Sequence, residues 1–243
     1  KNKGFFKTAA ALLAALVLVP FLCGLLAAVM PADARNRESW LAIAVAAGGL
    51  LVAGSLYPAV AAGQVLREEL AWLPAQGLYF VLRVDGLAWA LTMLVLTISL
   101  QVVLYARYYM SAADPVPRFF AFLLAFMGSM LGVVLSGNLV QLVVFWELTS
   151  LTSFLLIGYW HHRADARRGA RMAFTVTATG GLCLMAGVLV LGNIVGSYDL
   201  DVVLAAGERI RADELYRPAL VLIALGALTK SAQFPFHFWL PHA

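Results

Sequence analysis

The stretch VQLVVFWELTSLTSFLLIGYW, which runs from Val140 to Trp160, decides the fold class of this chain. An α-helix needs about 20 mostly apolar residues to cross the hydrocarbon core of a bilayer, and this stretch is long enough to do so. Its one formal charge, on Glu147, lies near the middle. The stretch therefore predicts a membrane-spanning helix that carries a glutamate close to the bilayer centre.

Composition extends this interpretation to the whole chain. Of the 243 residues, 63% are hydrophobic and only 12% are charged, whereas soluble domains are roughly half apolar and a quarter charged. Backbone polar groups in lipid must be satisfied within each segment, so every span is expected to be an α-helix. We predict an all-α, polytopic membrane helix bundle with about seven transmembrane helices, over residues 8–30, 40–62, 86–106, 119–136, 139–160, 172–195 and 218–240.

The two cysteines of the chain predict neither a disulfide nor a metal site. Cys23 and Cys183 both lie within apolar runs, where a thiol is usually an inert apolar group. We therefore expect no disulfide and no metal site. The net charge is +4. In a membrane protein the basic residues of the loops indicate orientation across the bilayer. We therefore expect no nucleic-acid partner.

The connections carry their own signals. HHRADARRGAR, residues 161–171, holds four arginines, and this density predicts a cytoplasmic loop in which His161 and His162 are solvated. Residues 136–138 predict a turn, and Asp199 is expected to cap a short surface helix. The G-x-x-x-G pairs at 128/132 and 192/196 are a weak indication of close helix approach.

Glu147 and Lys230 are the only formal charges inside the predicted spans. Each lies about one or two residues from the middle of its span, so at about 1.5 Å per residue both are close to the bilayer midplane. A charged side chain at a helix centre costs about 2.5 to 3.5 kcal/mol of insertion free energy and usually marks an ion or proton pathway. We therefore predict that the pair carries proton translocation. The alternatives are an ion pair that fixes helix packing, and a glutamate kept protonated in the core.

The last predicted span, ALVLIALGALTKSAQFPFHFWLP, contains a helix breaker. Pro235 lacks an amide hydrogen and would clash with the carbonyl of Ser231, so the helix should kink or break just after Lys230. Broken membrane helices commonly line cavities for transported ions, although an ordinary proline kink is the alternative. His237 and His242 follow, and we predict them as proton relays, with hydrogen-bonded core histidines as the alternative.

Several segments resemble those of a known protein family, and the match covers more than half of the chain. They are VDGLA (84–88), RYYM (107–110), PRFFAF (117–122), GNL (137–139), FWELTSLTSFLLIGYW (145–160), GARMAF (169–174) and GALTKSAQFPFHFWLPHA (226–243). They resemble the antiporter-like family that is shared by Mrp-type sodium/proton antiporters and the proton-pumping subunits of respiratory complex I.

The resemblance implies a specific architecture and site. Family members have fourteen core helices with two inverted five-helix repeats, so residues 1–110 would form three peripheral transmembrane helices and residues 111–243 most of the first repeat. The family's essential glutamate on the fifth helix corresponds to Glu147, and its lysine on the broken seventh helix to Lys230. Complex I's distal pumping subunit typically has an aspartate near Gly181, and its absence here favours the antiporter branch. Arg171 is the one further residue of the sixth helix to which the resemblance extends.

The resemblance also implies a function. We expect an ion-translocating subunit of a multisubunit sodium/proton antiporter in a bacterial cell membrane, which makes it a secondary transporter and not an enzyme. An ion gradient would drive the exchange, so no cofactor is expected. Its partners would be H⁺, Na⁺, the lipid bilayer and other membrane subunits. The alternative is a proton-pumping subunit of complex I or of a related membrane-bound hydrogenase. A third interpretation is a scaffold in which the charge pair only fixes helix packing.

Overall fold

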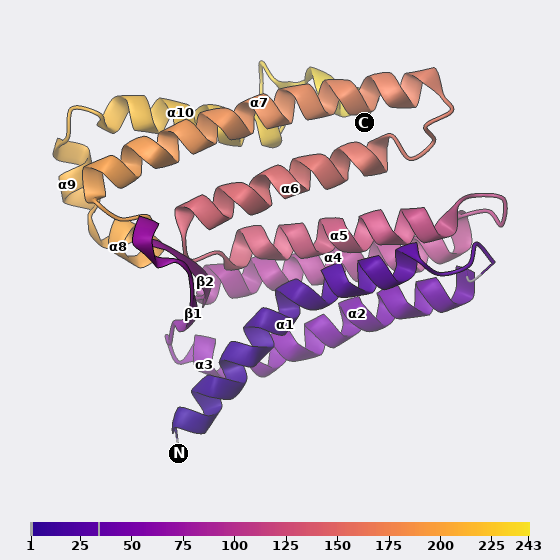
Figure 1. The fold of residues 1–243 in the computed structure, drawn as a ribbon, viewed down its shortest axis with the longest axis horizontal. Helices are drawn as coiled ribbons and strands as arrows, with labels where there is room; N and C mark the ends of the chain where they lie inside the picture. The colour runs from indigo at the N-terminus through magenta and orange to yellow at the C-terminus, as the bar shows by residue number, and fades with distance from the viewer. Residues whose placement is uncertain (1, 34) are drawn as a thin grey trace. The chain divides into compact units, whose positions relative to one another are not determined.

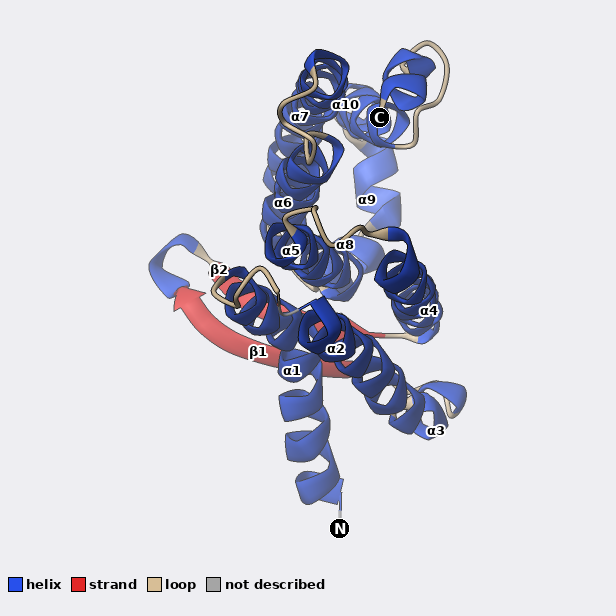
Figure 2. Cartoon of the chain, turned by 90° about the vertical axis from the view of Figure 1, so that its right-hand side faces the viewer, coloured by secondary structure: helices blue, strands red, loops and turns tan. Residues whose placement is uncertain are grey.

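A computed structural model describes residues 2–33 and 35–243 (Figure 1). These residues fold into two compact units. Unit 1 contains the residues up to Glu68 together with Leu82–Leu135, and unit 2 contains Glu69–Val81 and Ser136–Ala243. Nearly all of the regular structure is helical, as Figure 2 shows. The elements in chain order are α1 (Asn2–Ala28), α2 (Arg35–Ser55), α3 (Tyr57–Ala61), β1 (Leu66–Leu73), η1 (Pro74–Gln76), β2 (Leu78–Val84), α4 (Gly86–Tyr109), α5 (Val116–Leu135), α6 (Leu139–Ile157), α7 (Ala164–Val195), α8 (Leu200–Ala205), α9 (Gly207–Ala212), α10 (Tyr216–Lys230) and η2 (His237–His242).

The apolar runs form helices of membrane-spanning length. Within the described residues, six helices are long and apolar enough to cross a bilayer, and they are α1, α2, α4, α5, α6 and α7. The seventh predicted span differs, because α10 has only 15 residues and ends at Lys230. Residues 237–242 then form a short 3-10 helix. The chain is thus a multi-pass helical membrane protein. Its seventh predicted span is broken, because α10 ends at Lys230.

Unit 1 is held together by close helix packing. In α1, Gly24 lies against the backbone of α5, and Gly128 of α5 lies so close to the ring of Phe21 that an added Cβ would come within 2.8 Å. In α2, Gly49 contacts Leu96 of α4 in the same way. Glycine at these positions lets the helix axes approach, as the spacing at Gly128 indicated.

Asp85 defines the start of α4. Its carboxylate accepts a hydrogen bond from the Ala88 amide at 2.9 Å and pairs with the Arg83 guanidinium at 2.6 Å. Burial alone would raise the pKa of the Asp85 carboxyl, but the Ala88 amide and Arg83 outweigh burial and hold this pKa below its ordinary value. Asp85 therefore serves as an ionised N-cap just outside the membrane-spanning part of α4.

A β-hairpin between α3 and α4 was not predicted. Strands β1 and β2 form a two-stranded sheet, drawn as arrows in Figure 2, and Gly77 with φ of +69° makes the turn. In unit 2, the Gln141 side chain of α6 accepts from the Val81 amide at 2.7 Å and donates to the Val81 carbonyl at 2.9 Å. Gln141 therefore pairs with β2 as a neighbouring backbone would, and it fixes this strand to α6.

The start of α2 corrects one prediction. The predicted span began at residue 40 and left Glu38 in a loop, but α2 begins at Arg35 and Glu38 is fully buried. The candidate membrane span, residues 36–55, includes Glu38 and Arg37. Arg37 and Glu38 therefore lie at the end of this span, and the predicted boundary at residue 40 was too late. The boundary was predicted too late because charged residues near a helix end resemble a loop in sequence.

The end of α7 confirms one prediction and corrects another. Asp199 accepts hydrogen bonds from the amides of Asp201 and Val202 and caps α8, as predicted. Gly192 does not bring two helices together, because an added Cβ there would overlap the ring of Tyr198. Gly196 has φ of +79° and ends α7 in the left-handed conformation that favours glycine.

Candidate functional site

Asn138 positions the helix that carries the candidate site. Its side-chain oxygen accepts hydrogen bonds from the amides of Val140 and Gln141 and thereby starts α6. Helix α7 packs against α6 on one side and against α10 on another, so residues of all three helices meet along α7 (Figure 1). This arrangement brings Lys230 at the end of α10 to the middle of α6.

Lys230 binds one turn of α6. Its ammonium donates to the carbonyl oxygen of Trp146 at 3.1 Å and to Oγ of Ser150 at 2.5 Å. These residues are four positions apart, so both acceptors lie on one face of the helix. The ammonium also lies 5.3 Å from the centroid of the Trp146 ring, within range of a cation–π interaction. The sequence predicted the lysine as a functional residue but did not predict these partners.

Glu147 lies between these two residues on α6, and its carboxyl group faces α7. A Cβ atom at Gly181 would overlap Oε1 of Glu147. Among the described residues, this oxygen is buried without a hydrogen-bond partner, and no ion pair joins Glu147 to Lys230. The two groups are still close enough for coulombic attraction. The structure thus brings both predicted residues to one helical turn, with the lysine bound to Ser150 and not to the carboxylate.

Two adjacent glycines of α7 make room for this arrangement. A Cβ atom at Gly180 would overlap the side chain of Thr229 on α10, and one at Gly181 would overlap Glu147 on α6. Thr229 is nearly fully buried and precedes Lys230. In the sequence, Gly181 was notable only for the acidic group it lacks, whereas the structure shows that the glycine leaves the space that the carboxyl group of Glu147 occupies.

The break after Lys230 has a defined geometry. The Ala232 amide donates to the Thr229 carbonyl at 3.4 Å, and the Gln233 amide donates to the Leu228 carbonyl at 3.0 Å. Ala232 has φ of +52°, so these bonds form the Schellman motif with alanine in the position that usually holds glycine. The helix therefore ends before Pro235, and Lys230 lies in its last turn, where the helix dipole favours a cation.

The structure does not bring the two predicted histidines to Lys230. His237 is exposed and stacks on the ring of Phe234 with a centroid distance of 5.5 Å. His242 is exposed too, and its carbonyl group lies against Gly169 of α7. Neither imidazole forms a hydrogen bond within the described part of the chain. Their role as proton relays stays a prediction.

The arginines at the start of α7, which the sequence predicted to be cytoplasmic, are exposed. Arg163 pairs with Asp165 at 2.6 Å, and Arg171 donates to the carbonyl of Arg167 within its own helix. His161 and His162 contact each other edge to face. No contact to Glu147 or Lys230 is made by this segment in the described structure, so nothing here assigns Arg171 a part in the site.

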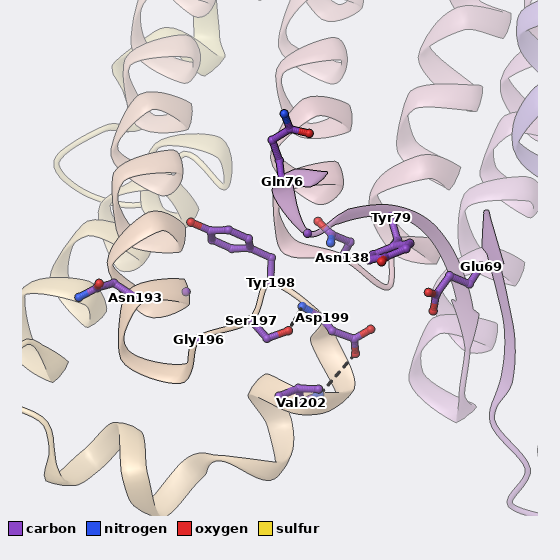
Figure 3. Close-up of a pocket in the computed structure, with 12 residues that line it drawn as sticks. Glu69, Gln76, Tyr79, Asn138, Asn193, Gly196, Ser197, Tyr198, Asp199 and Val202 are labelled. Carbon is purple, nitrogen blue, oxygen red and sulfur yellow. Dashed lines mark hydrogen bonds between the residues drawn. The ribbon is translucent and has the colours of Figure 1, made fainter. Parts of the chain in front are cut away.

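Two of the cavities in the described structure lie in unit 2. The first, of about 480 Å³, is an open and mostly apolar groove between α6 and α7, with Glu147 in its wall beside Val144, Leu151 and Leu182. The second, of about 530 Å³, is polar and lies where the hairpin tip meets the start of α6 and the end of α7 (Figure 3). Its lining includes Glu69, Tyr79, Asn138, Ser197 and Asp199. In the described residues, no three acidic, histidine or cysteine side chains are grouped as metal ligands.

Comparison with family models covers both units. Residues 136–243 match the model described as "NADH:quinone oxidoreductase/Mrp antiporter, TM". Residues 72–120 match the model described as "NADH-Ubiquinone oxidoreductase (complex I), chain 5 N-terminus". The first match contains all the residues of the Glu147–Lys230 site.

Comparison with individual proteins gives similar results. The chain is 61% identical, over 96% of its length, to the A/B subunit of a probable K(+)/H(+) antiporter of Rhizobium meliloti (strain 1021). It is 43% identical, over 74% of its length, to the A subunit of the Na(+)/H(+) antiporter of Alkalihalophilus pseudofirmus. A chain in the structure of the Mrp complex from Dietzia sp. DQ12-45-1b aligns over 95% of this chain with a TM-score of 0.82 and 32% identity. The chain spans 23% of each of these two relatives and 25% of that structure.

Proposed function

The chain belongs to the antiporter-like family described as NADH:quinone oxidoreductase/Mrp antiporter, and we propose that it is the N-terminal part of the A subunit of an Mrp-type antiporter that moves protons through Glu147 and Lys230. The observation that carries this proposal is that the Lys230 side chain, at the end of α10, reaches the same turn of α6 that carries Glu147. Ionisable groups at such depth, next to a broken helix, are typical of ion pathways.

The mechanism uses two positions of the Lys230 ammonium. In the position of the present structure, it binds the Trp146 carbonyl and Ser150. Oε1 of Glu147 then has no hydrogen-bond partner among the described residues, which favours the carboxyl group with its proton bound. When the ammonium moves to Glu147, opposite charge stabilises the carboxylate and the proton is released. Alternation between the two positions therefore couples lysine movement to proton uptake and release at Glu147.

The exchanged ion is a monovalent cation. The sequence resemblance implied Na⁺, and the Alkalihalophilus relative is named for Na⁺. The relative with 61% identity is named for K⁺, so K⁺ is an equal candidate. Other membrane subunits would complete the complex in a bacterial plasma membrane. In this assignment, residues 1–110 supply three peripheral transmembrane helices and residues 111–243 supply the first part of the translocating bundle.

Two variants of Glu147 test the proposal in the full complex. Glu147→Gln keeps the shape but cannot ionise, and Glu147→Asp keeps the charge on a shorter side chain. In membrane vesicles at matched protein levels, we expect exchange to be abolished by Gln and weakened by Asp, with Na⁺ and K⁺ supplied separately. The control is Glu208→Gln, because the side chain of Glu208 on α9 is 93% exposed. Full exchange with Gln and a loss with Asp would support the scaffold interpretation instead.

A further inference from the structure

Glu38 is a buried acid that the proposed exchange does not use. It lies in the first turn of α2, in unit 1, with 0% of its surface exposed. Neither of its two side-chain oxygens has a hydrogen-bond partner. Among the described residues with buried and unpartnered side-chain atoms, Glu38 is the one with two such atoms. The Glu38 carboxyl group is therefore closed to solvent, and no described residue donates a hydrogen bond to it.

Within the part of unit 1 that the structure describes, the helices around Glu38 do not pair a counter-charge with it. Glu38 shares a face of α2 with Ala42 and Ala46, which are fully buried, and α2 packs against α1, α3, α4 and α5. None of the described titratable or charged side chains on these elements forms a hydrogen bond or ion pair with Glu38. These side chains are Lys7 and Cys23 on α1, Arg37 on α2 itself, Tyr57 on α3, Tyr105, Arg107, Tyr108 and Tyr109 on α4, and Arg118 on α5. The Arg107 guanidinium, for example, stacks on the Trp40 ring at 4.6 Å.

An ionised carboxylate in these surroundings would be strongly unfavourable. Desolvation of an unpaired charge is far more costly than the stabilisation that the α2 dipole gives a carboxylate in the first turn. A buried acid without a partner therefore takes up a proton and becomes neutral. We propose that Glu38 is a second proton-binding carboxyl of this protein, held as the neutral acid inside unit 1. This site is independent of Glu147 and of the proposed exchange.

The pH dependence of thermal stability tests this site. Glu38 is protonated in the folded protein and ionised in the unfolded chain near neutral pH, so unfolding releases a proton and stability falls as pH rises. Each pH unit in this range lowers the folding equilibrium constant about tenfold relative to Glu38→Gln, which carries no proton to lose. We expect the melting temperature of the assembled complex to fall below that of the variant by an amount that grows with pH. Glu208→Gln, with an exposed acid replaced, should show no growing difference.

Other outcomes contradict the site. A difference between wild type and Glu38→Gln that stays constant with pH, or a variant that loses more stability at high pH, would show that Glu38 is ionised in the folded protein. If the variant does not assemble, carbodiimide labelling of the wild-type complex decides, because dicyclohexylcarbodiimide adds to a protonated carboxyl in an apolar site. We expect a mass-spectrometric adduct on Glu38 that decreases at alkaline pH and no adduct on Glu208. Absence of the Glu38 adduct overturns the proposal.

Discussion

Replacing Ser150 with alanine removes one of the two hydrogen-bond acceptors that hold the Lys230 ammonium. The Ser150 hydroxyl is 1% exposed and accepts from Lys230 at 2.5 Å, while the Trp146 carbonyl remains as the second acceptor at 3.1 Å. A hydrogen bond to a charged group contributes about 1.5 to 3 kcal/mol. Its loss should reduce the occupancy of this lysine position by roughly 10- to 150-fold, since about 1.4 kcal/mol is a factor of ten. If the lysine alternates between this position and Glu147, exchange should fall by about tenfold or more.

The assay is cation-driven proton movement in vesicles that carry the full complex, followed with a pH-sensitive dye. Ser129→Ala is the matched control, because Ser129 on α5 is fully buried and its hydroxyl bonds to the Ala125 carbonyl of its own helix at 2.7 Å. Ser150→Thr keeps a hydroxyl and should recover part of the exchange. Wild-type exchange in Ser150→Ala, at matched protein level, would refute the role of this lysine position.

The remaining predictions concern a glycine and a helix cap. Gly181→Ala places a Cβ where Oε1 of Glu147 lies, so we expect a loss of about 1 to 3 kcal/mol in stability and reduced exchange, partly restored by adding Glu147→Asp. Gly54→Ala, where an added Cβ meets no atom, should change neither the melting temperature nor exchange. Asp85→Asn removes the pair with Arg83. Because the Asp85 pKa is lowered in the folded protein, its stabilisation is present above the unfolded pKa and is lost as pH falls through the folded value. Asp85→Asn should therefore have a lower melting temperature than wild type near neutral pH, and the difference should disappear in acid. An equal difference at every pH would contradict an ionised cap.

The residues of the candidate site were only partly predictable. Glu147 and Lys230 could be selected from sequence, because charges inside long apolar runs are rare and costly. Ser150 and Gly181 could not be selected as their partners, since a serine or a glycine in a membrane helix carries no signal of which neighbour it faces. Glu38 was assigned to a loop, because a span boundary in sequence is uncertain by a few residues. The contacts of Ser150 with Lys230 and of Gly181 with Glu147 join helices that are separate along the chain.

The sequence by itself determined that this chain is a multi-pass helical membrane protein with a break after Lys230. Apolar length sets which segments can cross a bilayer, and a proline within a helix interrupts its hydrogen bonds, so both features are local. Only the tertiary structure decided that Lys230 binds Ser150 while Glu147 faces Gly181. It also decided that Gln141 fixes a β-hairpin that the sequence did not predict. Those outcomes depend on how α7 packs against α6 and α10 and on how the hairpin pairs with α6, and such packing is set by contacts between side chains far apart in sequence.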